Sequence, residues 1–126
     1  MPYIKLTTTK KLTFEQKQAL SEGLTEAVKV IPNKVVIFLF VEDGKTVFVA
    51  NKEQEDIVFL EFDLTGHFDI ETKRAFSAAA CPVITRIIGT PPEGISMRIT
   101  EHSCWGNFGD FVECQDNGLP VGVDSL

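Results

Sequence analysis

The chain opens with Met1-Pro2-Tyr3-Ile4-Lys5-Leu6-Thr7, where a proline directly follows the methionine and apolar side chains alternate with polar ones. Such alternation predicts a strand with one buried face, over about residues 2–8. If Met1 is removed, the ring nitrogen of Pro2 becomes a free secondary amine. That amine can act as a base when apolar surroundings and a nearby cation lower its proton affinity.

A helix is predicted after this strand, because Thr13 and Gln16 match a capping box in which each side chain binds the other residue's amide. The helix should end before Pro32, which lacks the amide hydrogen that a helix interior needs. Its apolar residues fall on one helical stripe: Leu20, Leu24, Ala27, Val28 and Ile31.

Residues 35–41 are apolar at every position, which predicts a strand covered on both faces. Two helices can cover one face of a small sheet, so we expect another subunit to cover the second face. The remaining elements are predicted as a turn at 42–45, a short strand at 46–50, a loop at 51–56, a strand at 57–64, a helix N-capped by Asp69 and containing Pro82, a strand at 95–100, and a hairpin within 102–109.

The two halves of the chain repeat one pattern. Under a shift of 56 (71 − 15), the matched pairs are Glu15 with Glu71, Ala19 with Ala75 and Val28 with Ile84. Under a shift of 59 (101 − 42), they are Phe38 with Met97, Phe40 with Ile99 and Glu42 with Glu101. We therefore predict one domain over residues 1–126 in which a β-α-β unit occurs twice, at about 2–50 and 57–111. Right-handed crossovers then give an α+β fold: a four-stranded sheet with two helices on one face.

Composition argues against two classes of function, nucleic-acid binding and membrane spanning. A net charge of −6 argues against a nucleic-acid partner, which usually requires a basic surface. No apolar run approaches the roughly eighteen residues of a membrane span, and no signal region opens the chain, so we expect a cytoplasmic protein without membrane contact.

The cysteines, Cys81, Cys104 and Cys114, are widely spaced, and with two histidines they form no metal-ligand pattern. We expect reduced thiols, no metal and no other cofactor. Cys104 and His102 could act as nucleophile and base, since they share a strand face, but packing is the commoner role of such a thiol.

A duplicated β-α-β unit with proline at position two resembles the tautomerase superfamily, the group of 4-oxalocrotonate tautomerase and macrophage migration inhibitory factor. The resemblance is carried by Pro2, by residues 15–17 at the start of the first helix, and by residues 99–101 followed by 106–109. It covers residues 2 to about 111.

The resemblance implies a homotrimer whose sheets face inward, with one site per subunit interface. It also implies that Pro2 shuttles a proton between an oxygen and a carbon of a small enol, α-keto or unsaturated carboxylic acid. Such chemistry needs a cation to hold the substrate carboxylate, and Arg98 of a neighbouring subunit is our candidate. Alternatively, Arg98 pairs with an acidic neighbour such as Asp63 or Glu61 inside the barrel. Ser96 lies where 4-oxalocrotonate tautomerase has a strand arginine.

The resemblance assigns further substrate-binding residues. Lys34 can replace the lysine that the macrophage factor has before its second strand, if the loop shifts. Thr65 matches a position whose backbone faces the substrate. Trp105 and Phe108 would form the apolar wall beside the proline, or would simply pack within the hairpin.

Two other functions stay open at the sequence level: a trimeric interaction protein with little catalysis, and a ferredoxin-like ligand-binding module with the same order of elements. Nor does the sequence choose among tautomerisation, decarboxylation, hydration and dehalogenation.

Overall fold

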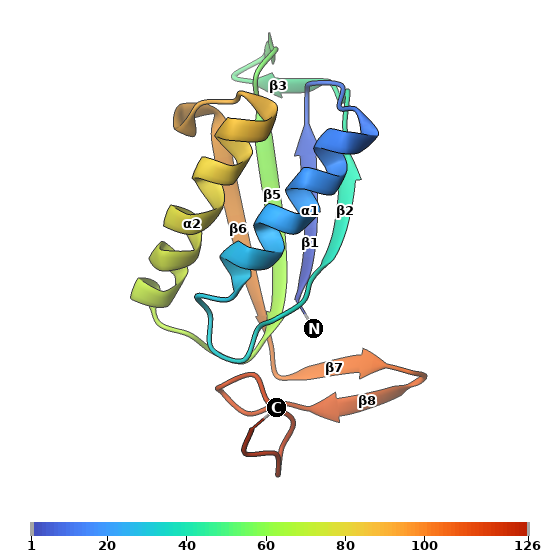
Figure 1. Cartoon of the computed structure of the whole chain (residues 1–126), viewed down its shortest axis with the longest axis vertical. Helices are drawn as coiled ribbons and strands as arrows, with labels where there is room; N and C mark the ends of the chain where they lie inside the picture. The colour runs from blue at the N-terminus through green and yellow to red at the C-terminus, as the bar shows by residue number, and fades with distance from the viewer. Residues whose placement is uncertain (1, 126) are drawn as a thin grey trace.

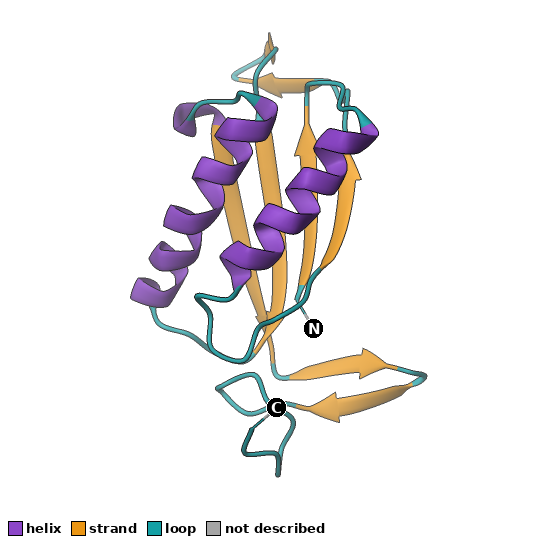
Figure 2. Cartoon of the chain, viewed as in Figure 1, coloured by secondary structure: helices purple, strands orange, loops and turns teal. Residues whose placement is uncertain are grey.

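A computed structural model describes residues 2–125 and shows a four-stranded sheet with both long helices packed on one face (Figures 1 and 2). The main elements are β1 (Tyr3–Thr8), α1 (Phe14–Val28), β2 (Phe38–Glu42), β5 (Val58–Thr65), α2 (Ile70–Ile88) and β6 (Ile95–His102). Two hairpins accompany them, β3 (Val47–Val49) with β4 (Lys52–Gln54) and β7 (Cys104–Asn107) with β8 (Asp110–Glu113), and a 3-10 turn spans Pro92–Gly94. The predicted fold class is confirmed.

The strand order is β2-β1-β5-β6, with parallel pairs β1–β2 and β5–β6 joined by the antiparallel pair β1–β5. Each β-α-β half therefore keeps its own two strands adjacent. A ferredoxin-like sheet interleaves the strands of its halves instead, so that alternative is wrong.

Local chemistry sets the N-terminal ends of both helices as predicted. The amide of Gln16 donates to Oγ1 of Thr13 at 3.1 Å, and the amide of Thr13 donates to Oε1 of Gln16 at 2.8 Å. Asp69 caps α2 by accepting from the amide of Thr72 at 2.8 Å, and Pro82 lies inside that helix. The completed caps satisfy amides that have no partner within the helix.

The core lies between the helices and the sheet. Its fully buried side chains come from β1, β5 and the predicted helix stripes, and include Ile4, Leu6, Leu20, Leu24, Leu60, Phe62, Phe76 and Ile84. The helices approach closely at Gly23, where an added Cβ would lie 2.5 Å from Cγ1 of Val83. Glycine at this position thus brings α1 against α2.

Strand β2 begins at Phe38 rather than at residue 35, which corrects its predicted start. As expected for a small sheet with two helices, only one face of β2 is covered within the chain. Phe38 is 46% exposed and Phe40 50% exposed, whereas Leu39 and Val41 pack against the core. A second subunit over the open face remains a prediction.

The predicted repeat register of this strand is also wrong. Tyr3 pairs with Phe38, and the equivalent Phe59 pairs with Ser96, so Phe38 corresponds to Ser96 under a shift of 58 (96 − 38) rather than to Met97. A slip of one residue exchanges the two faces of a strand. Phe38 and Ser96 are accordingly both exposed, and Met97 packs against the core.

Residues 51–56 were expected to form a loop, but they contain β4, which pairs with β3. The chain reverses at Ala50 and Asn51, whose φ angles are 50° and 66°. Positive φ at both turn residues suits the twist of a two-residue hairpin. Ala-Asn is a weak sequence signal for such a turn, because alanine seldom adopts positive φ.

The C-terminal hairpin turns at Phe108 and Gly109 and lies beyond the sheet end at which β6 finishes (Figure 1). After Glu113 the chain returns to the body. The amide of His67 donates to the carbonyl of Asp116 at 2.7 Å, and Cys114 bridges to Pro120. Within residues 2–125, no helix is both long enough and apolar enough to span a membrane.

Candidate functional site

A cavity of about 330 Å³ opens where the start of β1, the loop after α1, the end of β5 and the C-terminal segment meet. Four residues predicted from the sequence line it: Pro2, Lys34, Thr65 and Trp105. Its volume lies in the range of roughly 300–1,000 Å³ that small-molecule sites occupy. This cavity is our candidate active site.

Pro2 is buried at the cavity wall. Its carbonyl accepts a hydrogen bond of 2.9 Å from the amide of Phe38, which fixes the start of β1 against β2. Met1, whose removal would free the proline nitrogen, lies outside the described residues. The liberated amine therefore stays a prediction.

Lys34 brings a positive charge into the same cavity. Its side chain is nearly inaccessible, and Nζ donates to both the carbonyl oxygen and Oγ1 of Thr65, each at 3.0 Å. Burial lowers the pKa of Lys34 because it disfavours the charged amine, while the nearby charge of Cys114 acts in the opposite direction. Among residues 2–125, Lys34 has no acidic partner within ion-pair distance.

Thr65 joins the lysine to the C-terminal segment. Its hydroxyl donates to the carbonyl of Gly118 at 3.0 Å. Gly118 has a φ of +86°, and a Cβ there would lie 2.5 Å from Nζ of Lys34 and 2.7 Å from the carbonyl oxygen of Thr65. Only glycine combines this backbone conformation with so close an approach.

Sequence reasoning missed the segment 114–120, which contributes Cys114, Gly118, Leu119 and Pro120 to the cavity wall. It also missed Asn33, whose side chain donates to the carbonyl of Asn117 at 3.0 Å and ties the loop after α1 to this segment. The dipeptide Asn117-Gly118 was an available signal, since it marks a turn. A turn alone would not have shown where the segment packs.

Trp105 contributes an apolar side of the cavity, with its ring centroid 5.6 Å from that of His102. His102 in turn places Nε2 2.8 Å from Oδ1 of Asp63, so the tryptophan packs on a fixed neighbour. Phe108 is 96% exposed at the hairpin turn and does not line the cavity.

Arg98 and Ser96 lie on the sheet face opposite the helices, away from the cavity of their own chain. Arg98 is paired with Glu61 of the adjacent strand, and its Cζ lies 5.9 Å from the ring centroid of Phe59. The structure thus shows the ion pair that was the alternative role of Arg98. Substrate binding by Arg98 of a neighbouring subunit remains a prediction.

Glu101 lies outside the candidate site, in a second hollow of about 250 Å³. Its carboxylate accepts from the amide of Phe68 at 2.6 Å and from Nζ of Lys73 at 2.9 Å, and His67 lies 3.2 Å away. Burial raises the pKa of Glu101, but the hydrogen bonds and positive charges of these neighbours outweigh it and hold the pKa below its ordinary value. This carboxylate joins β6 to the start of α2.

No protein-family model matches the chain, and no curated protein matches it. Solved structures do. MIF2 of Leishmania major superposes with a TM-score of 0.79 at 14% identity, covering 88% of this chain and 97% of that one. Pt0534, solved after inactivation by 2-oxo-3-pentynoate, gives a TM-score of 0.74 at 18% identity and covers 94% of each chain. A fused 4-OT solved as an asymmetric trimer gives 0.74 at 15% identity, covering 86% of this chain and 94% of that one.

Identities this low establish shared architecture, whereas activity depends on individual side chains. The superpositions extend over most of each chain, and the neighbours comprise macrophage migration inhibitory factor-like proteins and 4-OT. The chain therefore shares the fold of these proteins, a four-stranded sheet with two helices on one face, as the resemblance implied.

Proposed function

We propose that the protein is a tautomerase-like enzyme in which Pro2 shuttles a proton on a small α-keto, enol or unsaturated carboxylic acid. The observation that carries the proposal is the convergence of Pro2 and Lys34 on one cavity of about 330 Å³. One group can move a proton there, and the other can hold an anion. Enzymes with this fold among the solved structures support an activity of the same general kind.

The proposed reaction moves one proton from oxygen to carbon. The free nitrogen of Pro2 takes the enol hydroxyl proton, the oxygen lone pair becomes a carbonyl, and the carbon–carbon π electrons take a proton from the prolinium. Lys34 retains one ammonium hydrogen beyond the two that face Thr65, and this hydrogen can bind the substrate carboxylate. Burial and the charge of Lys34 both favour the neutral, basic form of the proline.

The same proposal includes assembly as a homotrimer through the open sheet face. Phe38 and Phe40 leave large apolar surfaces exposed on β2, and the ring of Tyr3 stacks on Phe40 with centroids 4.8 Å apart. A 4-OT neighbour solved as a trimer supports this assembly. In this trimer, the cavity of each subunit would be reached by three residues of an adjacent subunit: Arg98, Ser96 and Phe108. Trp105 would form the apolar wall of the cavity in its own subunit.

We also propose a cytoplasmic location. The three cysteines, Cys81, Cys104 and Cys114, are all free thiols. Free thiols suit a reducing compartment.

The enzyme proposal is tested with phenylpyruvate enol as substrate. Wild-type protein should accelerate ketonisation, and Pro2→Ala should slow the catalysed step by roughly 10²–10⁴-fold, the usual contribution of a positioned acid–base group. Pro91→Ala changes an exposed proline in the loop between α2 and β6 and is the matched control. Equal rates for wild type and Pro2→Ala would contradict the proposal.

A second candidate is a trimeric interaction protein with little catalysis. It is favoured by the pairing of Arg98 with Glu61, which neutralises the cation expected to bind substrate. Intact-mass measurement of protein from its native cell discriminates the two. A mass without methionine keeps the proline nitrogen available, whereas a retained methionine makes that nitrogen an amide and supports the second candidate.

A further inference from the structure

The β7–β8 hairpin supplies one wall of the cavity, although it stands apart from the main sheet. Three residues on one face of the hairpin line the cavity: Trp105, Asn107 and Val112. Trp105 and Val112 are cross-strand partners, and Asn107 lies two positions along the same strand face. The main sheet consists of β2, β1, β5 and β6, so its hydrogen-bond ladder ends before this wall begins.

A side-chain contact spans the bend between the sheet and the hairpin. The chain bends at Ser103, the single residue between β6 and β7, and Figure 1 shows β7 running across the direction of the main strands. His102 is the last residue of β6 and Trp105 the second residue of β7. Their ring centroids lie 5.6 Å apart with the planes at 70°, a favourable edge-to-face arrangement.

Asp63 of the neighbouring strand β5 fixes the histidine ring. Nε2 of His102 lies 2.8 Å from Oδ1 of Asp63. The carboxylate is itself on a rigid support, because Phe62 and Leu64 on either side of it are buried in the core. A hydrogen bond from one ring nitrogen to a carboxylate sets the orientation of an imidazole. The packed core thus determines the place of the tryptophan through two successive side-chain contacts.

We propose that Asp63 and His102 are positioning residues that hold the Trp105 face of the hairpin over the cavity. They thereby set the affinity of the cavity for the apolar part of a bound carboxylic acid. The choice of an acid as ligand rests on the proposed function. The positioning itself is measured without turnover, because it concerns the wall of the cavity and not the proton shuttle.

Trp105 is the only tryptophan of the chain, so its fluorescence reports on the wall directly. Asp63→Ala should shift the emission to longer wavelength and increase quenching by acrylamide, because the released indole gains contact with water. Asp63→Asn should keep the wild-type values, since its amide offers both an acceptor and a donor to the histidine ring. Thr100→Ala is the matched control, at the exposed residue that pairs with Asp63 in the sheet.

Two acids that differ only by a phenyl ring, 3-phenylpropionate and propionate, test the effect on affinity. Calorimetric titration of Asp63→Ala should show 3-phenylpropionate bound roughly three- to tenfold more weakly than by wild type, as expected from one aromatic contact. The affinity for propionate should be unchanged. In the proposed enzyme, the same variant should raise KM for phenylpyruvate enol and leave kcat unaltered, because the wall contacts substrate and transition state equally.

His102→Phe is a second, independent variant in case Asp63→Ala loses its fold, which circular dichroism would reveal. It keeps an aromatic ring beside Trp105 but lacks the nitrogen that binds Asp63, so it should reproduce the shifted emission and the weaker binding of 3-phenylpropionate. Wild-type fluorescence and affinity in both variants would overturn the proposal. Equal weakening of 3-phenylpropionate and propionate would also overturn it, since a wall of this kind acts on the phenyl ring alone.

The experiment also separates this inference from the proposed function. Pro2→Ala removes the proton shuttle but should leave the preference for 3-phenylpropionate intact. A wild-type protein that does not ketonise, yet has a preference that depends on Asp63, rejects the proposed function alone. Ketonisation that depends on Pro2, with a preference that does not depend on Asp63, rejects the positioning role alone.

Discussion

Lys34 keeps its charge in a place where burial works against it. The two hydrogen bonds to Thr65 replace part of its lost hydration, and Thr65 is held in turn by the carbonyl of Gly118. The remaining cost lowers the lysine pKa below its ordinary value of 10.5. Such a residue weakens the fold, and in the proposed function its charge binds the substrate carboxylate.

A first prediction follows from this pKa. Between the lowered folded value and 10.5, the unfolded state binds more protons than the folded state, so stability should rise with pH in that window. Urea unfolding at pH values from neutral to about 10.5 should therefore show wild type gaining stability relative to Lys34→Met. Lys29→Met, at an exposed lysine, controls for the loss of one charge. Parallel pH curves for wild type and Lys34→Met would refute the prediction.

Glu101 also makes stability rise with pH, but in an acidic window. Its folded pKa lies below the ordinary 4.5, so its stabilising contribution is complete above 4.5 and is lost as pH falls through the folded pKa. Glu101→Gln should be less stable than wild type at neutral pH, and the difference should shrink in acid below 4.5. Denaturant titration on both sides of that pH checks this, with Glu71→Gln on the exposed side of α2 as control. A difference that stays constant in acid would be the contrary result.

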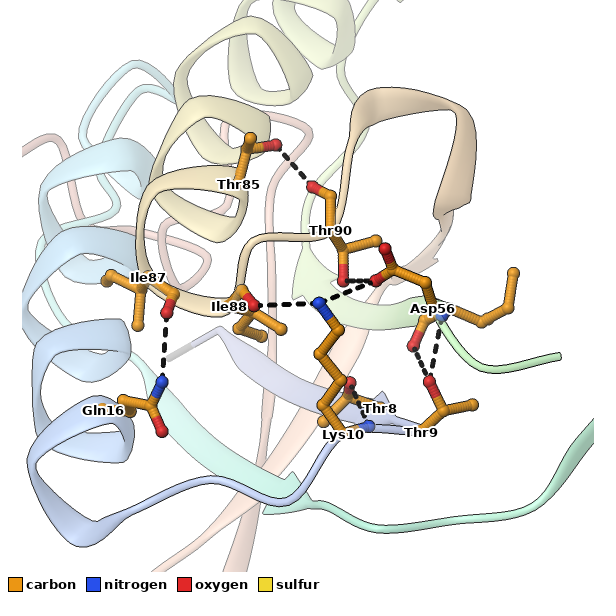
Figure 3. Close-up of polar contacts among 10 residues, drawn as sticks. Thr8, Thr9, Lys10, Gln16, Asp56, Thr85, Ile87, Ile88 and Thr90 are labelled. Carbon is orange, nitrogen blue, oxygen red and sulfur yellow. Dashed lines mark hydrogen bonds and ion pairs between the residues drawn. The ribbon is translucent and has the colours of Figure 1, made fainter.

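At the scale of elements, one polar network ties the end of α2 to both halves of the sheet (Figure 3). Nζ of Lys10 donates to the carbonyl of Ile88 at 3.4 Å and lies 3.3 Å from Oδ1 of Asp56. The hydroxyl of Thr90 donates to the same carboxylate oxygen at 2.6 Å. These contacts satisfy a carbonyl at the helix end and complement its negative dipole.

Thr90→Val tests that network, since it keeps the shape of a fully buried side chain and removes its hydroxyl. The free energy of unfolding should fall by about 1.5–3 kcal/mol, the value of a hydrogen bond to a charged group. The pKa of Asp56 should rise toward its ordinary value, because the bond from Thr90 is the main cause of its lowering. Thr25→Val, which removes a bond within α1, should cost less. NMR titration and urea unfolding measure the two effects, and an unchanged Asp56 pKa would contradict the account.

Sequence predicted the helices better than the strands, for a physical reason. Thr13, Gln16 and Asp69 act on amides within one helical turn, so local spacing is sufficient. Residues 35–41 are apolar throughout and contain no alternation that fixes a face, so the register of β2 came out one residue off. The register of β2 is decided only by its pairing with β1.

At the scale of the whole molecule, one face of the sheet has no cover within a single chain. Phe38 and Phe40 are exposed there beside Tyr3. A chain that exposes adjacent aromatic rings on a sheet is expected to bury them in an assembly. This agrees with the proposed trimer.

Phe40→Asp should therefore abolish the trimer and leave the monomer folded, because the ring is half exposed and faces away from the core. Sedimentation equilibrium measures the mass, and circular dichroism follows the fold. Phe48→Asp, at a 64% exposed residue of the β3–β4 hairpin, is the matched control and should remain trimeric. A Phe40→Asp protein with the wild-type mass would exclude this face from the assembly.

The candidate site was predictable in part. Pro2, Lys34, Thr65 and Trp105 line one cavity although they are far apart in the sequence, and their roles there stay predictions. The wall from 114–120 was not predictable, because main-chain contacts with Thr65 and Lys34 hold it in place and leave no periodic pattern.

The position of this wall along the chain has a consequence for biosynthesis. Residues 114–120 leave the ribosome after every strand and helix of the main layer, and long after Pro2. The hydrophobic layer can pack while translation continues, as domains commonly do. In the proposed function, substrate binding must wait until the seam between Pro2 and these late residues has closed. A nascent polypeptide arrested before Cys114 would therefore pack its sheet and helices while one wall of the cavity is still missing.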